Sequence, residues 1–364
     1  MDYFSFPILQ LGSLSGSLTT SVWVGVLVSC FFNLRFGWVL GGLVVPGYLV
    51  PLLMIKPWAV AVIFLEATVT FSVVLLFSEF LARFGMWNSL FGRDRFFAIL
   101  LVSVMVRLFF DILLLPELGR VINRTLHLTF DYETNLRGIG LIVVALFANR
   151  FWKPGWLAGT IQMAVSVAVT YFIVRYGLMV FTDYSISDLG RMYSDKAEYL
   201  WLTPKSYIII LVTAYTASRM NLDFGWEYGG ILIPALLALQ WHEPFKIMVT
   251  FLEAFVILAV GALTLRLPIF QDANMAGARK ILFFFNIGFL YELLLGYCIQ
   301  SIYGGNKIMD FYGFGYLITT LMAVEMYDKD IAVRSTVATI KTSLIAMLVA
   351  SLLGYSLTFL SHLP

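Results

Sequence analysis

The chain has 364 residues, of which 60% are hydrophobic and only 13% are charged. A typical soluble domain has about 45–50% apolar and about 25% charged residues, so this composition excludes an ordinary soluble protein and indicates a multi-pass membrane protein. Our expectation for its location is the cell (inner or cytoplasmic) membrane. The formal net charge of +2 does not point to nucleic acid as a partner; the bilayer itself is the expected surrounding.

The first distinctive element is a glycine–proline segment. Residues 41–46 read Gly-Gly-Leu-Val-Val-Pro, and residues 229–234 repeat the pattern as Gly-Gly-Ile-Leu-Ile-Pro. Glycine permits unusual backbone conformations and proline removes an N–H donor, so each segment predicts a break in a membrane helix. Such breaks are tolerated only where protein or a water-filled cavity satisfies the backbone, which favours a functional site, although tight helix packing is the alternative. The residues singled out at the breaks are Gly41, Gly42, Pro46, Gly229, Gly230 and Pro234.

Further correspondences predict a tandem duplication. Phe-Leu-Glu-Ala occurs at residues 64–67 and again at 251–254. We expect an N-terminal segment at 1–18, membrane repeats at 19–178 and 206–364, and a polar extramembrane linker at 179–205.

Apolar runs long enough to span a bilayer, which takes about 20 residues, are clearest at 58–81, 96–115, 155–174 and 343–360. Each repeat also contains two short apolar pieces. A helix of 12–14 residues reaches only about 20 Å, less than the ~30 Å hydrocarbon core. The predicted fold class is therefore an all-α polytopic membrane protein with two parallel pseudo-repeats of about six membrane segments each, including short broken or re-entrant helices.

Charged residues inside apolar segments are the other candidates, because they are costly there and face a bundle interior, a partner or a water-filled path. Glu66 and Glu253 occupy equivalent places in the two repeats. Each is either a proton or cation site, or a structural carboxylate that holds helices together.

Arg107 and Asp111 are four residues apart, so on a helix they share a face and can pair. The position that matches Arg107 in the second repeat is Glu292. Two arrangements remain open: Arg107 and Glu292 meet near a pseudo-two-fold axis, or each has a local partner such as Asp111.

No enzyme motif is present: there is no Gly-x-Ser-x-Gly elbow, no phosphate-binding Gly-x₄-Gly-Lys-Ser/Thr and no His-Glu-x-x-His. The three histidines are too scattered in the sequence to form a metal set. We therefore expect no catalytic residue, metal or cofactor in this chain.

Several stretches resemble the PgsC/CapC family, the membrane subunit of poly-γ-glutamate synthesis and export. The family's Gly-Leu-Val-Val-Pro-Gly-Tyr-Leu stretch is present letter for letter at residues 42–49. Residues 139–150 resemble a second family stretch that ends in Asn149 and a charged residue, Arg150. The family's basic loop resembles residues 92–96, and the end of the following span resembles residues 108–111. Because the family subunit is about as long as one repeat, the chain resembles two subunits fused.

The resemblance implies a partner, a cytoplasmic ATP-dependent amide ligase, together with other subunits of an assembly. The ligase would form the bonds, and this chain would be a platform or conduit for an anionic γ-linked glutamyl polymer. Carboxylates favour arginine and helix N-termini. The candidates for guiding the polymer are the broken-helix ends and Arg93, Arg95, Arg107 and Arg150.

Two other functions are compatible with the residues alone. The repeat organisation is also typical of an autonomous secondary transporter, here of a small anion. A membrane docking subunit that conducts nothing is the third possibility.

Overall fold

The structure is a computed structural model that describes residues 9, 14, 17–84, 92–126, 141–186, 204–224, 232–239, 241, 243–270, 274–303, 316–329 and 332–361. The regular elements among these residues are all helices. This confirms the predicted all-α fold class.

The first half of the chain contains a series of helices interrupted by π-helical turns. The α-helices are α1 (Leu18–Phe36), α2 (Val45–Ile55), α3 (Pro57–Leu75), α4 (Leu81–Arg83), α5 (Gly92–Phe109), α6 (Leu115–Leu126), α8 (Leu141–Arg150), α9 (Trp156–Phe172) and α10 (Met179–Phe181). The π-helical turns Leu76–Phe80, Phe110–Leu114 and Ile173–Leu178 extend α3, α5 and α9.

The second half repeats the pattern with fewer interruptions. Its α-helices are α13 (Pro204–Phe224), α14 (Leu232–Leu239), α15 (Pro244–Leu265), α16 (Ala278–Tyr303), α18 (Tyr316–Lys329) and α19 (Ala332–Ser361).

Seven helical stretches within the described residues are long and apolar enough to cross a membrane. They are Leu18–Phe36, Pro57–Phe80, Arg95–Thr125, Trp156–Phe181, Pro244–Leu265, Ala278–Cys298 and Ala332–Leu353. The chain is therefore a polytopic membrane protein, as its composition predicts.

Short helices alternate with these long ones. The order long, short, long occurs twice in each half, with α2, α8, α14 and α18 as the short members of 11, 10, 8 and 14 residues. At 1.5 Å per residue these helices reach only about 12–21 Å. Two of the long helices that follow a short one, α3 and α15, begin with proline in their first turn, where its missing N–H leaves no intrahelical bond unmade.

The chain packs as two compact units. The N-half unit comprises residues 24–175, and the C-half unit comprises residues 1–23 and 176–364. The predicted repeat boundaries at 19–178 and 206–364 stay a prediction, as does the parallel relation of the repeats. The predicted linker at 179–205 lies mostly outside the described residues.

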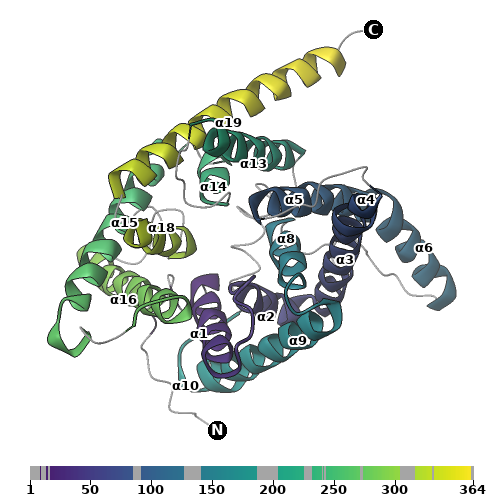
Figure 1. Ribbon diagram of the computed structural model, residues 1–364. Helices are drawn as coiled ribbons and strands as arrows, with labels where there is room; N and C mark the ends of the chain where they lie inside the picture. The colour runs from purple at the N-terminus through teal and green to yellow at the C-terminus, as the bar shows by residue number, and fades with distance from the viewer. Residues whose placement is uncertain are drawn as a thin grey trace. The chain divides into compact units, whose positions relative to one another are not determined.

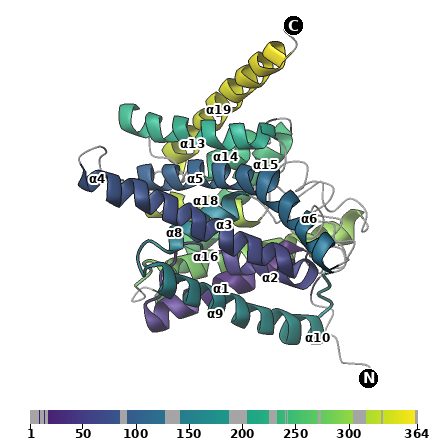
Figure 2. The same cartoon turned by 90° about the vertical axis from the view of Figure 1, so that its right-hand side faces the viewer.

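Within the N-half unit, α3, α5 and α8 pack against one another, and α2 contacts α3 and α9 (Figure 1). Within the C-half unit the equivalent helices α15, α16 and α18 pack together, and α13, α14 and α19 lie side by side in both views (Figure 1, Figure 2). The two halves thus use corresponding helix pairs.

Candidate functional site

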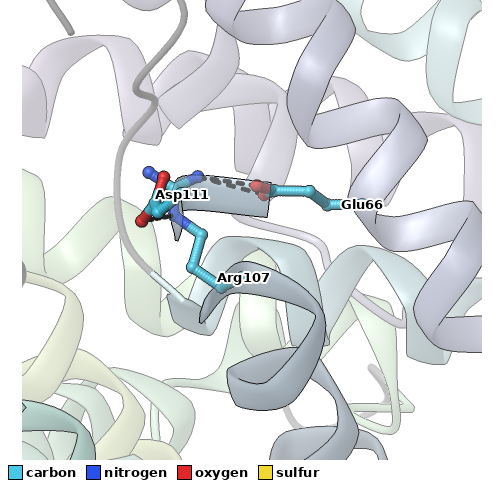
Figure 3. A network of polar contacts seen from close by, with 3 residues as sticks. All are labelled: Glu66, Arg107 and Asp111. Atoms are coloured by element: carbon cyan, nitrogen blue, oxygen red, sulfur yellow. Dashed lines mark hydrogen bonds and ion pairs between the residues drawn. The ribbon is translucent and has the colours of Figure 1, made fainter. Parts of the chain in front are cut away.

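Three charged side chains form a network inside the N-half unit (Figure 3). Arg107 of α5 donates from Nη1 to both carboxylate oxygens of Glu66 on α3, at 3.0 and 3.1 Å, and from Nε to Asp111 Oδ2 at 3.1 Å. Glu66 is fully buried and Arg107 is 2% exposed. The local pairing with Asp111 that the four-residue spacing predicts is present, and the pairing with Glu66 was not among the predicted arrangements.

This network connects α3 to α5. Removing one partner of a buried ion pair typically costs about 3–5 kcal/mol, because the remaining charge is left uncompensated. Arg107 forms ion pairs with two carboxylates of its own half, and the pair with Glu66 links α5 to α3. A pairing of Arg107 with Glu292 stays a prediction.

The C-half unit has two acids in the equivalent place. Glu253 of α15 and Glu292 of α16 are 3% and 7% exposed, and they are close enough to interact electrostatically. In the first half, Asp111 lies four residues after Arg107. The residue four positions after Glu292 in the second half is Gly296, which has no carboxylate. The Glu–Arg–Asp network of the first half therefore becomes a pair of glutamates in the second.

The predicted break lies directly before α2. Residues 41–44 form a turn, in which Gly42 has a φ of +68°. A Cβ on Gly42 would lie 3.0 Å from the carbonyl oxygen of Leu146 in α8. Glycine is therefore required at position 42 both by backbone conformation and by close approach.

The rest of the break is in ordinary van der Waals contact with its surroundings. A Cβ on Gly41 would lie 3.6 Å from Arg150 Cα, and Pro46 is buried in the first turn of α2. In the second half, Pro234 is buried in α14, whereas Gly229 and Gly230 lie outside the described residues.

Arg150 is the last residue of α8 and is 1% exposed. Its Nε and Nη1 atoms have no hydrogen-bond partner within the described part of the chain. Asn149 beside it is only partly buried. A buried cation without a partner is unusual, because burial of a charge costs several kcal/mol unless it is paired.

Arg95 of α5 lies beside the same turn. Its guanidinium carbon is 4.8 Å from the ring centroid of Trp152, two residues after Arg150, and its Nε also lacks a partner among the described residues. Arg93 belongs to α5, but its side chain lies outside the described residues. The structure thus brings Arg95, the turn that carries Arg150 and the glycine break to one region of the N-half unit.

The chemistry of this region is that of anion recognition. Arginine pairs with carboxylates through charge-assisted hydrogen bonds, and the arginine side chains at this turn have donor atoms that are not used. Within the ranges that the structure describes, no group of three or more His, Cys, Asp or Glu residues could hold a metal ion.

The sequence analysis named Arg95, Arg107 and Arg150 as one group. It did not predict that Arg107 pairs with two carboxylates, whereas Arg95 and Arg150 keep donor atoms without a partner among the described residues. The signal that could have separated them is charge balance. Each of Arg95, Arg107 and Arg150 lies near an apolar segment, but only Arg107 has acidic residues, Asp111 on its own helix and Glu66 in the preceding span, at a depth that allows pairing.

Comparison with known proteins supports both the family and the duplication. A sequence model of the family described as "Capsule biosynthesis CapC" matches residues 24–160 and again residues 212–335. The chain is 33% identical over 135 residues to the PGA biosynthesis protein CapC of Bacillus subtilis (strain 168), covering 36% of this chain and 76% of that protein. It is 33% identical over 132 residues to the capsule biosynthesis protein CapC of Bacillus anthracis, again covering 36% and 76%. No solved structure matches. The chain belongs to the CapC family of capsule biosynthesis proteins, and it carries two family regions in tandem.

Proposed function

We propose that this chain is the membrane subunit of a poly-γ-glutamate-type synthesis and export assembly in the cytoplasmic membrane. The observation that carries the proposal is the family match over both halves of one chain, together with relatives that are named for PGA and capsule biosynthesis. A fused pair of such subunits supplies in one polypeptide what two separate copies would supply together.

The chain is a platform or conduit, and a partner forms the bonds. Joining glutamates through amide bonds requires activation of a carboxylate, which a cytoplasmic ATP-dependent amide ligase provides. The product carries one free carboxylate per residue, so a path for it through the membrane needs cationic groups or N–H donors. Arg107 and Arg150 of the N-half unit and Lys280 of the C-half unit are buried cations among the described residues.

Gene deletion and complementation test the proposal. Cells that lack the chain should release no γ-linked glutamyl polymer, measured as material that a γ-glutamyl hydrolase degrades, and the full-length gene should restore release. The full-length chain purified from native membranes should co-elute with ATP-dependent glutamate-ligating activity. Unchanged polymer release after deletion contradicts the proposal, and uptake of a small anion by proteoliposomes that contain this chain alone would favour a transporter instead.

A further inference from the structure

We infer that Arg150, at the junction of α8 with the Gly41–Gly42 break, is a carboxylate-binding site for the γ-linked glutamyl polymer, and that the second half of the chain lacks this site. The inference rests on the proposed function, because that function supplies the carboxylate-bearing ligand. The chemistry itself, recognition of an oxyanion by a buried guanidinium, follows from the residues.

The first step is the energetic imbalance at Arg150. Its side chain is 1% exposed, and Nε and Nη1 find no acceptor in the described part of the chain. Desolvation of a cation costs several kcal/mol even after relaxation. Its position at the carboxyl end of α8 compensates this cost only in part through the helix dipole. An anion that accepts hydrogen bonds from the guanidinium would compensate the rest.

The second step is the position of this arginine. The last turn of α8 packs directly against the glycine break. A Cβ added to Gly41 would lie 3.6 Å from Arg150 Cα, and a Cβ added to Gly42 would lie 3.0 Å from the Leu146 carbonyl oxygen. The two helices that meet here, α2 and α8, are both too short to cross a bilayer. Arg150 is therefore located where the regular helix packing of the N-half unit is interrupted.

The amino end of α2 is the other candidate at this break. The Val45 N–H already donates to the Gly42 carbonyl oxygen at 3.0 Å, and Pro46 has no N–H. The Gly47 nitrogen is covered by α1, since a Cβ on Gly25 would lie 2.3 Å from it. That the broken-helix end binds the polymer stays a prediction, and the present inference concerns the arginine side chains.

A second cation extends the site. Arg95 stacks on Trp152 at 4.8 Å, in the turn that directly follows Arg150. Its stacking on an indole face holds the guanidinium plane without using its N–H donors. Because the polymer carries a carboxylate on every residue, a second arginine beside the turn that carries Arg150 gives it a further cationic contact.

The third step is the contrast between the two halves. The corresponding helices α8 and α18 begin at Leu141 and Tyr316, so counting from these starts matches Asn149 with Val324 and Arg150 with Glu325. The sequence comparison of the two repeats likewise matches Arg107 with Glu292. Both buried arginines of the first half thus correspond to glutamates in the second, and a carboxylate repels a polyanion.

Binding by the purified full-length chain, in nanodiscs of zwitterionic lipid, tests the inference. The probe is a fluorescently labelled γ-linked glutamate oligomer. The variants are Arg150→Gln, which removes the charge, Arg150→Lys, which keeps it, and Glu325→Gln as the matched control in the second half. Arg150→Gln should weaken binding by about tenfold or more, because hydrogen bonds to charged groups contribute roughly 1.5–3 kcal/mol. Arg150→Lys should retain part of the affinity, and Glu325→Gln should bind as the wild type does.

Thermal unfolding separates a binding residue from a structural one. In the absence of oligomer, Arg150→Gln should melt at the wild-type temperature or above it, because it removes a buried charge whose Nε and Nη1 atoms have no hydrogen-bond partner among the described residues. A lower melting temperature together with lost binding would mark Arg150 as structural and overturn the inference. The wild-type protein gives an independent reading: the oligomer should raise its melting temperature, and no rise at saturating oligomer overturns the inference even if the variants do not fold.

A lipid phosphate is the other source of the same chemistry. Nanodiscs that contain phosphatidylglycerol test whether a lipid phosphate, and not the polymer carboxylate, binds at Arg150. If Arg150→Gln lowers retention of phosphatidylglycerol but leaves oligomer binding unchanged, the site belongs to lipid and the inference is wrong. If polymer release by cells depends on the chain while Arg150→Gln binds oligomer as the wild type does, the inference fails and the proposed function stands. If polymer release does not depend on the chain, the proposed function itself fails.

Discussion

Replacement of Gly42 by alanine tests whether the break before α2 is held open by its contact with α8. Gly42 and Gly37 have the same φ of +68°, but their surroundings differ. A Cβ on Gly42 would lie 3.0 Å from the Leu146 carbonyl oxygen and 3.2 Å from a methyl group of Val45, whereas a Cβ on Gly37 would meet nothing within 4 Å. Gly37→Ala is therefore a matched control that has the backbone strain without the collision.

The two substitutions should differ by the cost of the collision alone. The left-handed conformation costs an alanine about 1–2 kcal/mol, and a reduced entropy of the unfolded chain recovers about 0.4–1 kcal/mol, so Gly37→Ala should cost roughly 1 kcal/mol. At Gly42 the carbonyl is backbone and cannot rotate away, so we add an overpacking cost of about 1–3 kcal/mol. With about 2–4 °C per kcal/mol, Gly42→Ala should melt about 2–12 °C below Gly37→Ala.

Thermal unfolding of the full-length chain in detergent, followed by intrinsic tryptophan fluorescence, measures this gap. Equal melting temperatures for the two variants would show that the break does not pack against α8, and the account of the Arg150 region would lose its structural basis.

The charged residues give the remaining predictions. Glu66→Gln and Arg107→Met should each destabilise the fold by about 3–5 kcal/mol. The double variant should lose clearly less stability than the sum of the two single losses. Additive losses in the same melting assay would exclude a direct pair. The exposed pair of Glu117 and Arg120, 2.7 Å apart, is the control, and its coupling energy should not exceed about 1 kcal/mol. In a charge exchange, Glu292→Arg should not rescue Arg107→Glu, since Glu66 would still face a like charge; rescue of the melting temperature would support the predicted contact between the halves instead.

The features that could be predicted from the sequence are those that a few adjacent residues determine. The break at 41–46 is encoded locally, because a positive φ requires glycine and a proline in the first turn suits a helix start. The predicted span at 58–81 agrees with the stretch Pro57–Phe80, because hydropathy alone defines it. The predicted span at 96–115 stops short of the observed stretch Arg95–Thr125, because α6 continues the helix with polar residues such as Glu117 that a hydropathy run does not include.

The contacts that define the candidate site could not be predicted in this way. Glu66 and Arg107 are 41 residues apart on different helices, and only the packing of α3 on α5 brings them together. The difference between Arg107, which has two carboxylates, and Arg150, whose Nε and Nη1 are unused within the described residues, likewise arises from tertiary packing.

Polymer synthesis by reconstituted membranes tests the central claim most directly. Membranes that contain the full-length chain, mixed with the ATP-dependent ligase that co-purifies with it, should incorporate labelled glutamate into material that a γ-glutamyl hydrolase degrades, and membranes without the chain should not. Incorporation at the same rate and to the same length by the ligase with chain-free membranes would contradict the account.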